Sequence, residues 1–305
     1  MLRDLYVLGT AQLTRRYGPL DQRTDQTLPD TRALLSLAAT SGFGAVDTAP
    51  AYGNAEEAIG LSGTRLEVHT KLAADEDPTA SVARSLRQLA RPVLDVLYVH
   101  DARLLLDDPH GVIPAAHTLV GTTVRDLGVS VYDETEFEAA VTDGRFSVIQ
   151  VPYNLVDRRF DPDRLEVAVA RGIRVIARSV LLQGILVSEP DRLPTDVAHL
   201  AGVVADLRAV GRHFGRSPLE LAVGWVKAND GLGGLILGAE STDQLREIAG
   251  ALAAAPLADD ELGALAGVEL PSPAEVDPRS WMLPGWPPLP SASGNGGDGG
   301  ERERR

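Results

Sequence analysis

Short apolar runs recur along the chain, and each is followed by a longer segment whose apolar residues return at helical spacing. The apolar runs predict eight strands, at residues 5–9, 44–47, 66–71, 94–100, 126–130, 148–151, 174–177 and 234–237. The segments between them predict helices, at residues 31–41, 78–89, 134–142, 164–171, 197–213, 218–227 and 242–253. The strands are continuous rather than alternating apolar runs, which is the pattern of strands buried on both faces.

Several of these helices carry a start or a stop signal. Asp30 and Asp133 precede the first residues of two of them, and an aspartate side chain is a good N-cap. Ser217 and Pro218 fit the N-cap and the first position of another helix. Gly172 follows the helix at 164–171, where glycine can adopt the left-handed conformation that ends a helix.

The alternation of strands and helices over the whole chain predicts an α/β fold, a closed parallel (β/α)8 barrel (TIM barrel). A doubly wound open sheet is the alternative, and it is less favoured because no glycine-rich dinucleotide fingerprint follows the first strand. We expect a single barrel domain at residues 1–270. Residues 271–290 are rich in proline and should pack on the barrel, whereas residues 291–305 are glycine-rich and polar and should be disordered.

The composition argues against several classes of function. The net charge of −14 argues against a nucleic-acid-binding surface. Because the chain has no cysteine, it can form neither a disulfide framework nor a thiolate metal site. No apolar run approaches the roughly 20 residues that a bilayer-spanning helix needs, and no secretion signal opens the chain. We therefore expect a cytoplasmic protein that binds neither nucleic acid nor a membrane.

Three consecutive predicted strands end in groups that can move or polarise a proton. Asp47 ends the second strand, Lys71 the third and His100 the fourth, and a phenol, Tyr52, follows Asp47 in the next loop. The carboxyl ends of the strands meet at one rim of a barrel, where the chemistry of such barrels takes place. Taken singly, each residue fits an ordinary turn, loop or surface position, but together they predict a catalytic site.

Three later motifs follow further predicted strands: Gly128-Val129-Ser130, Gln150-Val151-Pro152-Tyr153-Asn154 and Gly238-Ala239-Glu240-Ser241-Thr242-Asp243-Gln244-Leu245. With the four residues above, these motifs resemble the aldo-keto reductase superfamily, from about residue 8 to about residue 252. The resemblance implies a reversible, NAD(P)H-dependent reduction of an aldehyde, ketone or sugar carbonyl to the alcohol. It also implies a catalytic tetrad of Asp47, Tyr52, Lys71 and His100.

Carbonyl reduction by hydride transfer leaves negative charge on the oxygen, so a proton donor must meet that oxygen. The pKa of a tyrosine is about 10, and a nearby ammonium lowers it by favouring the phenolate. Lys71 is the candidate ammonium for Tyr52, and Asp47 would keep it charged and in place. His100 would donate a second hydrogen bond to the carbonyl. The hydride must come from a cofactor, because no side chain supplies one.

The cofactor that the resemblance implies is NADP, with NAD as the alternative. Ser130, Gln150 and Arg178 match positions at the nicotinamide, and Ser179, Leu181 and Gly184 match the loop under the pyrophosphate. The matches at the adenosine end are Gly238, Ser241, Gln244 and Glu247. That last segment leads into a predicted helix, whose N-terminus offers N–H donors and a favourable dipole to phosphate.

Some positions depart from the family pattern. Val131 stands where an asparagine usually contacts the carboxamide. Arg178 replaces an aromatic that stacks on the nicotinamide; a guanidinium can also stack, or it can reach an anionic substrate group. Gln244 and Gly238 stand where the family often has the arginine and lysine that bind a 2′-phosphate, so the choice between NADP and NAD stays open. Ile248 replaces an adenine-contacting asparagine.

Aromatic residues are candidates for the substrate mouth. Tyr17 lies in the loop after the first predicted strand, and Trp281 and Trp286 lie in the proline-rich segment. We predict substrate contacts for Tyr17 and Trp281. The alternative is that the tryptophans pack the C-terminal segment onto the barrel, and this is our interpretation of Trp286.

Two other functions are compatible with the same barrel. A non-catalytic nucleotide-binding or sensor protein is implied by family members that serve as channel subunits, and the intact tetrad disfavours it. A hydrolase with two carboxylates would need a second acid opposing Asp47 across the mouth. The sequence therefore predicts first an oxidoreductase, with a small-molecule carbonyl compound as its partner and no metal.

Overall fold

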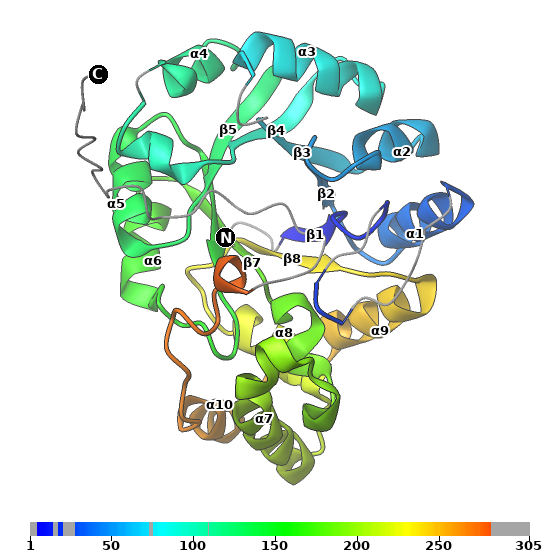
Figure 1. Cartoon of the computed structure of the whole chain (residues 1–305), viewed down its shortest axis with the longest axis vertical. Helices are drawn as coiled ribbons and strands as arrows, with labels where there is room; N and C mark the ends of the chain where they lie inside the picture. The colour runs from blue at the N-terminus through cyan, green and yellow to red at the C-terminus, as the bar shows by residue number, and fades with distance from the viewer. Residues whose placement is uncertain (1–4, 15–17, 21–27, 73–75, 109, 282–305) are drawn as a thin grey trace, which may run out of the picture.

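The computed structural model describes residues 5–14, 18–20, 28–72, 76–108 and 110–281. Eight strands in this part of the chain form one closed parallel barrel, in which chain neighbours pair and β8 pairs with β1 (Figure 1). The strands are β1 (Leu5–Gly9), β2 (Ala45–Asp47), β3 (Glu67–Lys71), β4 (Leu94–Val99), β5 (Val124–Ser130), β6 (Val148–Pro152), β7 (Arg174–Arg178) and β8 (Gly234–Gly238). The predicted TIM barrel is confirmed.

Helices lie around the outside of the strand ring (Figure 1). They are α1 (Leu28–Thr40), α2 (Ala55–Ser62), α3 (Pro78–Leu89), α4 (Val112–His117), α5 (Glu134–Asp143), α6 (Pro162–Ala170), α7 (Ala201–Phe214), α8 (Pro218–Lys227), α9 (Thr242–Ala253) and α10 (Asp259–Ala266). Short 3-10 helices occupy Ala102–Leu105, Leu182–Val187, Pro190–Arg192, Thr195–Leu200 and Pro278–Ser280.

Where the sequence carries clear end signals, the elements begin as predicted. The predicted bounds of β1, α3, α8 and α9 agree with the structure. The Asp133 side chain accepts a hydrogen bond from the Glu136 N–H at 2.9 Å at the start of α5. Ser217 and Glu220 form a reciprocal capping box at the start of α8, since each side chain accepts from the other residue's N–H.

Other helix predictions were wrong or incomplete. The helix predicted from residue 31 begins at Leu28, so Asp30 is not its N-cap; proline fits the first turn of a helix, and Pro29 permits the earlier start. The long helix begins at Ala201 rather than at residue 197, because 3-10 turns precede it. Three short helices were missed, and α2 contains Gly60, which weakens a helical signal.

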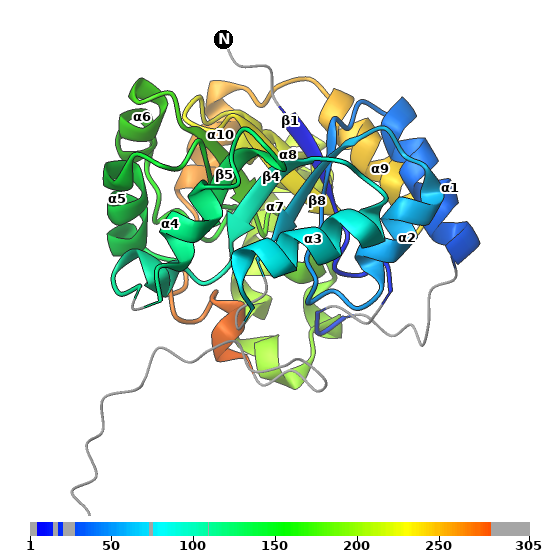
Figure 2. The same ribbon diagram turned by 90° about the horizontal axis from the view of Figure 1, so that it is seen from above.

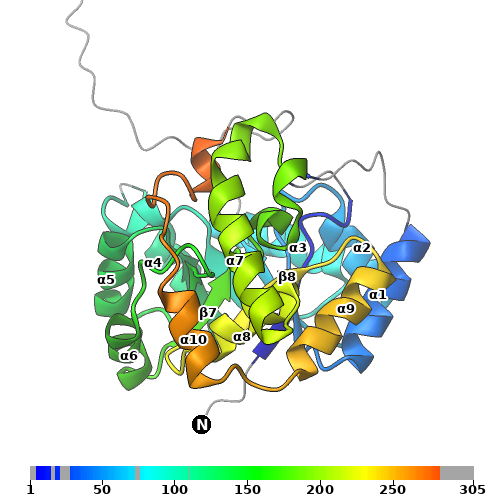
Figure 3. The ribbon, with the colours of Figure 1, turned by 90° about the horizontal axis from the view of Figure 1, so that it is seen from below.

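All eight strand pairs are parallel, so the C-terminal ends of the strands lie at one end of the barrel. Figure 2 shows the strands between α1, α2 and α9 on one flank and α4–α6 on the other, with α3 across the front. The segment that links β7 to α7 and the short helix Pro278–Ser280 both extend at this end (Figure 3). Part of the β7–α7 segment lines the cavity described below.

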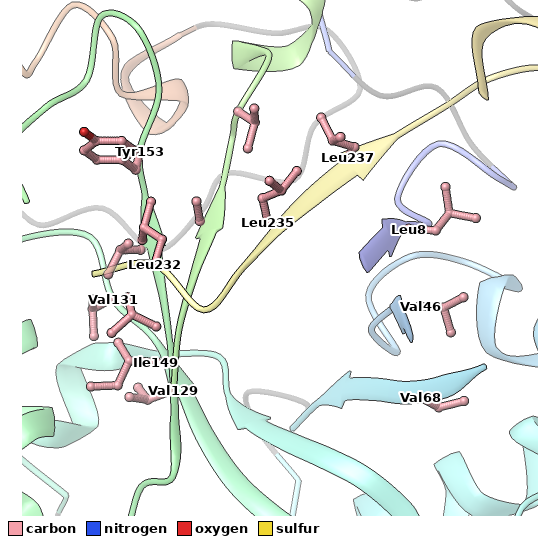
Figure 4. Close-up of a cluster of buried hydrophobic side chains, with 14 of the residues drawn as sticks. Leu8, Val46, Val68, Val129, Val131, Ile149, Tyr153, Leu232, Leu235 and Leu237 are labelled. Atoms are coloured by element: carbon pink, nitrogen blue, oxygen red, sulfur yellow. The ribbon is translucent and has the colours of Figure 1, made fainter. Parts of the chain in front are cut away.

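The main core lies between the strand ring and the helices. It contains buried side chains from several strands, among them Leu8, Val46, Val68, Val129, Ile149, Leu235 and Leu237 (Figure 4). Side chains alternate between the two faces of a strand, so the intervening residues point into the barrel. There Val96, Tyr98, Val148 and Ile176 form a separate apolar cluster, which fills the interior beneath the rim.

A second apolar cluster joins the C-terminal part of the chain to the barrel. It includes Leu155, Leu186, Leu207 and Trp281, and Val276 lies in it as well. These residues come from the loops after β6 and β7, from α7 and from the segment before residue 282. The described part of the proline-rich segment therefore packs on the barrel; the boundaries proposed for the domains remain a prediction.

Two glycines in helices test how tightly the outer shell is packed. A Cβ added at Gly60 in α2 would lie 2.2 Å from the carbonyl oxygen of Gln88, whereas one at Gly250 in α9 would meet nothing within 4 Å. Gly60→Ala should therefore lower the free energy of unfolding by about 1–3 kcal/mol through overpacking. Gly250→Ala should raise it by up to about 1 kcal/mol through helix propensity. Urea denaturation of both variants measures these changes. The same change in the free energy of unfolding for both variants would contradict the described packing.

Candidate active site

The centre of the site is a buried ion pair between the ends of two adjacent strands. The Lys71 Nζ, at the end of β3, donates to the Asp47 Oδ1, at the end of β2, at 2.6 Å. It also donates to the backbone oxygen of Thr48 at 2.9 Å. Asp47 is 5% exposed and Lys71 3% exposed. Because an unpaired charge at this depth would be costly, each group stabilises the charged form of the other.

The phenol of Tyr52 lies beside this ammonium. The Lys71 Nζ is 5.1 Å from the centroid of the Tyr52 ring. The loop that carries the ring is anchored, because the Thr14 hydroxyl donates to the backbone oxygen of Tyr52 at 2.8 Å. Gly53 follows with a φ of 62°, a left-handed conformation that favours glycine and that turns the chain tightly behind the phenol.

His100 follows β4 and faces the same cavity. Burial lowers the pKa of its imidazole to about 4, and the charge of Lys71 acts in the same direction. The imidazole is therefore neutral near pH 7, with one N–H to donate and no charge of its own.

Gln150 and Tyr98 support the ion pair from within the barrel. The Gln150 Nε2 donates to the second carboxylate oxygen of Asp47 at 2.7 Å, although 103 residues separate the two. The amide of Gln150 also hydrogen-bonds the hydroxyl of Tyr98, whose pKa is raised by burial and by the charge of Asp47. Both oxygens of Asp47 thus have a fixed partner, which holds the carboxylate in one orientation.

The loop after β7 has an unusual backbone. Ser179, Leu182 and Gln183 have φ angles of 58°, 46° and 54°, in the left-handed region that residues other than glycine rarely adopt. The Asn154 Nδ2 donates to the backbone oxygen of Ser179 at 3.0 Å and holds the start of this loop. Gly184 continues the series with a φ of 90°. Strain of this kind, of about 1–3 kcal/mol per residue, is typical of ligand sites.

The segment from β8 into α9 forms another part of the cavity wall, and we call Gly238, Glu240, Gln244 and Glu247 the β8–α9 end. A Cβ at Gly238 would lie 2.1 Å from the amide nitrogen of Gln12, so no larger residue fits there without displacing Gln12. The Gln244 Oε1 accepts from the backbone N–H of Glu240 at 2.8 Å. Ser241 caps α9 by accepting from the Gln244 N–H at 3.2 Å.

These groups surround one cavity of about 580 Å³, a size typical of small-molecule and cofactor sites. Thirteen of the sequence-predicted residues line it: Asp47, Tyr52, Lys71, His100, Ser130, Gln150, Arg178, Ser179, Leu181, Gly184, Gly238, Gln244 and Glu247. The three-dimensional arrangement thus brings together residues that are spread over six strands of the barrel.

Comparison with known proteins identifies the family. A family model described as "Aldo/keto reductase family" matches residues 6–269. The chain belongs to the aldo/keto reductase family. Membership implies an oxidoreductase, and the family acts on small carbonyl compounds. Among curated protein sequences, none matches the chain.

Solved structures of other family members share the fold of this aldo-keto reductase. The glycerol dehydrogenase AKR11B4 from Gluconobacter oxydans has a TM-score of 0.67 at 22% identity, over 86% of this chain and 90% of that one. The holo form of the aldo-keto reductase AKR11C1 from Bacillus halodurans has a TM-score of 0.68 at 22% identity, over 86% and 91% of the two chains. At this identity the likeness concerns the fold alone.

Two of the predicted residues that the structure describes, Ser241 and Trp281, do not line the cavity of this aldo-keto reductase. Ser241 acts as a helix cap. Trp281 is 8% exposed in the second apolar cluster, and its Nε1 donates to the backbone oxygen of Glu275 at 3.0 Å, which favours the packing alternative. Tyr17 lies outside the described residues, as does Trp286.

Other lining residues were not predicted. Gln12, Tyr132, Ser217 and Pro218 all face the cavity. A Ser-Pro helix start was recognised at α8, but nothing in the sequence indicates that this N-terminus points toward the strand rim. Tyr132 lies two residues after Ser130, and its position follows from the tertiary contacts described below.

The residues present fit a nicotinamide dinucleotide. The cavity is large enough, and the N-termini of two helices, α8 and α9, lie beside it, where the helix dipoles favour the negative charge of a pyrophosphate. Within the described ranges, no cluster of three or more His, Cys, Asp or Glu is arranged to hold a metal, and no helix is long and apolar enough to cross a membrane.

Stability should depend on His100 between pH 4 and pH 6.5. Because burial holds the pKa of His100 near 4 in the folded chain, the unfolded chain takes up the proton first as the pH falls. From pH 7 to pH 4 this group should lower the free energy of unfolding by about 3 kcal/mol. His100→Gln lacks this contribution. In urea denaturation, the free energy of unfolding should therefore fall by about 3 kcal/mol more in the wild type than in the variant between pH 7 and pH 4. Parallel stability curves would contradict a buried, neutral imidazole.

Proposed function

We propose that this aldo-keto reductase catalyses the reversible NAD(P)H-dependent reduction of an aldehyde, ketone or sugar carbonyl, with Tyr52 as the proton donor. The observation that carries this proposal is the buried Lys71–Asp47 pair at 2.6 Å with the Tyr52 ring beside the ammonium. The proposed site is the cavity that these residues share with His100.

Nicotinamide, when bound, supplies the hydride. As negative charge develops on the carbonyl oxygen, Tyr52 gives it a proton, and the Lys71 ammonium stabilises the phenolate that remains. Asp47 keeps that ammonium charged and fixed. The neutral imidazole of His100 donates its N–H to the same oxygen and orients the carbonyl. In the reverse direction the phenolate takes the proton from the alcohol.

The tetrad geometry weighs against the two alternative functions. Asp47 has both oxygens bound by Lys71 and Gln150, so it is poorly placed to act as one of a pair of hydrolytic carboxylates. A sensor protein would not need a proton donor beside an ammonium. A location in the cytoplasm remains a prediction from the sequence.

The residues of the β8–α9 end support a proposal for the nucleotide. NADP is the cofactor implied by the family resemblance, but the described lining residues here supply the carboxylates of Glu240 and Glu247 and no lysine or arginine. Gln12 fills the space that a longer side chain at position 238 would need, and Gln244 is engaged with a backbone N–H. Carboxylates accept hydrogen bonds from ribose hydroxyls and repel a 2′-phosphate, so these residues favour NAD.

Replacing Tyr52 tests the proton donor. Tyr52→Phe should lower kcat by about 100- to 10,000-fold, because the acid is lost. The Kd of the cofactor, measured by fluorescence quenching, should change by no more than a few-fold. Turnover is followed as cofactor oxidation over a panel of carbonyl compounds such as para-nitrobenzaldehyde, butanal and glyceraldehyde.

Tyr153→Phe is the matched control for that experiment. It removes a buried hydroxyl that hydrogen-bonds Asn229 outside the cavity, and it should leave kcat nearly unchanged. Undiminished turnover in Tyr52→Phe would exclude Tyr52 as the acid.

Separate titrations with NADH and NADPH test the nucleotide. We expect NADH to bind at least as tightly as NADPH. Gln244→Arg adds a cation at the β8–α9 end and should raise the affinity for NADPH relative to NADH by about tenfold, the size of a charge-assisted hydrogen bond. A strong NADPH preference of the wild type would contradict the assignment and would show that a cation meets the 2′-phosphate.

A further inference from the structure

We propose that the substrate carries an oxyanion group, a carboxylate or a phosphate, and that Arg178 binds this group beside the reacting carbonyl. The inference rests on the carbonyl reduction proposed above. Arg178 is the last residue of β7, and it lines the same cavity as Tyr52 and His100. Its charge acts on the His100 imidazole, so the guanidinium lies near the catalytic residues rather than at the β8–α9 end.

The charge of Arg178 has no counter-ion within the described part of the chain. Among the lining residues that the structure describes, the other lysine or arginine is Lys71, which is paired with Asp47. With that pair neutral, the catalytic side of the cavity carries the surplus positive charge of Arg178. An incoming oxyanion would offset this charge in a half-buried site, where electrostatic attraction is stronger than in water.

The charge of Arg178 acts on two carboxylates, and each of them is already bound by another arginine. Asp157 is held by Arg159, with Nε–Oδ1 at 2.7 Å and Nη2–Oδ2 at 3.0 Å. Asp277 is held by Arg279, whose Nη2 lies 2.6 Å from Oδ2. Each of these pairs is neutral by itself, so neither neutralises Arg178.

The guanidinium of Arg178 is held in place by neutral groups. Its Nε donates to the Ser130 hydroxyl at 3.1 Å, and its Nη2 donates to the backbone oxygen of Val131 at 2.9 Å. The Nη1 reaches the Ser179 hydroxyl at 3.5 Å. The Tyr132 ring stacks on the guanidinium at 4.1 Å from its centroid. An anchor held in this way loses little conformational entropy when a ligand binds.

The remaining donors match an oxyanion. A guanidinium has five N–H groups, and the three acceptors above leave one N–H on each terminal nitrogen of Arg178. Two parallel N–H groups of this kind form the bidentate contact by which arginine binds carboxylate and phosphate. Stacking on the nicotinamide is the other role open to Arg178, and it would not distinguish charged from neutral substrates.

Matched pairs of carbonyl compounds test the proposal. Succinate semialdehyde is compared with butanal for the carboxylate, and glyceraldehyde phosphate with glyceraldehyde for the phosphate. For at least one pair, the wild type should show a kcat/KM about 10- to 100-fold higher for the anionic member, mainly through a lower KM. The pair with the larger ratio identifies the oxyanion.

Three variants assign that ratio to Arg178. Arg178→Gln should bring it close to one, and because the ratio compares two substrates in the same variant, a change in the activity common to both cancels. Arg178→Lys keeps the charge but cannot make the bidentate contact, so it should retain part of the ratio. Arg145→Gln is the control, because it removes a guanidinium that is paired with Asp143 and does not line the cavity. It should leave the ratio unchanged.

Equilibrium binding separates this inference from the proposed reaction. Gamma-hydroxybutyrate and butanediol are titrated calorimetrically into wild type and Arg178→Gln, each with and without NADH. Tighter binding of the carboxylate, lost in the variant, supports the inference even if no carbonyl compound is turned over. A wild-type ratio near one in both pairs, or a ratio that survives in Arg178→Gln, overturns it while leaving the reductase function intact.

Discussion

The buried ion pair of Lys71 and Asp47 is the constraint on which the rest of the site depends. β2 and β3 are parallel, with Asp47 opposite His69, so Lys71 lies two residues further on and points to the same face. An ammonium and a carboxylate at the rim of an apolar barrel are stable only as a pair with their remaining hydrogen bonds satisfied. Thr48 and Gln150 satisfy them. The phenol of Tyr52 gains its chemical role because it is anchored next to this pair.

Charge is distributed unevenly around the cavity. The Lys71–Asp47 pair is neutral as a unit, Arg178 adds a positive charge beside it, and Glu240 and Glu247 lie on the β8 side of the ring. Arg178 ends β7, which neighbours β8, but its guanidinium is bound to Ser130 and to the backbone oxygen of Val131 at the end of β5, on the side away from β8. One side therefore suits an oxyanion near a carbonyl, and the other suits ribose hydroxyls. Both proposals on ligands follow from this asymmetry.

The sequence predicted the fold well because barrel strands are continuous apolar runs with the chemistry at their ends. The sequence alone placed Asp47, Lys71 and His100 at one rim, because the C-terminal ends of all strands of a parallel barrel lie at the same rim. It did not predict that Gln150 would bind Asp47, because this contact joins distant strands across the barrel interior. The hydrogen-bond partners of Arg178 could not be predicted for the same reason. The short helix α2 was missed because Gly60, required by its close packing on α3, resembles a helix breaker.

The most direct test of the account is the rate of a single turnover in Lys71→Met, which removes the ammonium and keeps the side-chain length. Lys227→Met is the control, because the Lys227 Nζ binds the backbone oxygen of Leu252 away from the cavity. With folding verified by circular dichroism and cofactor Kd measured in parallel, we expect hydride transfer to slow by about 100- to 10,000-fold in Lys71→Met alone. A rate within a few-fold of the wild type, with cofactor still bound, would contradict the role of the ion pair.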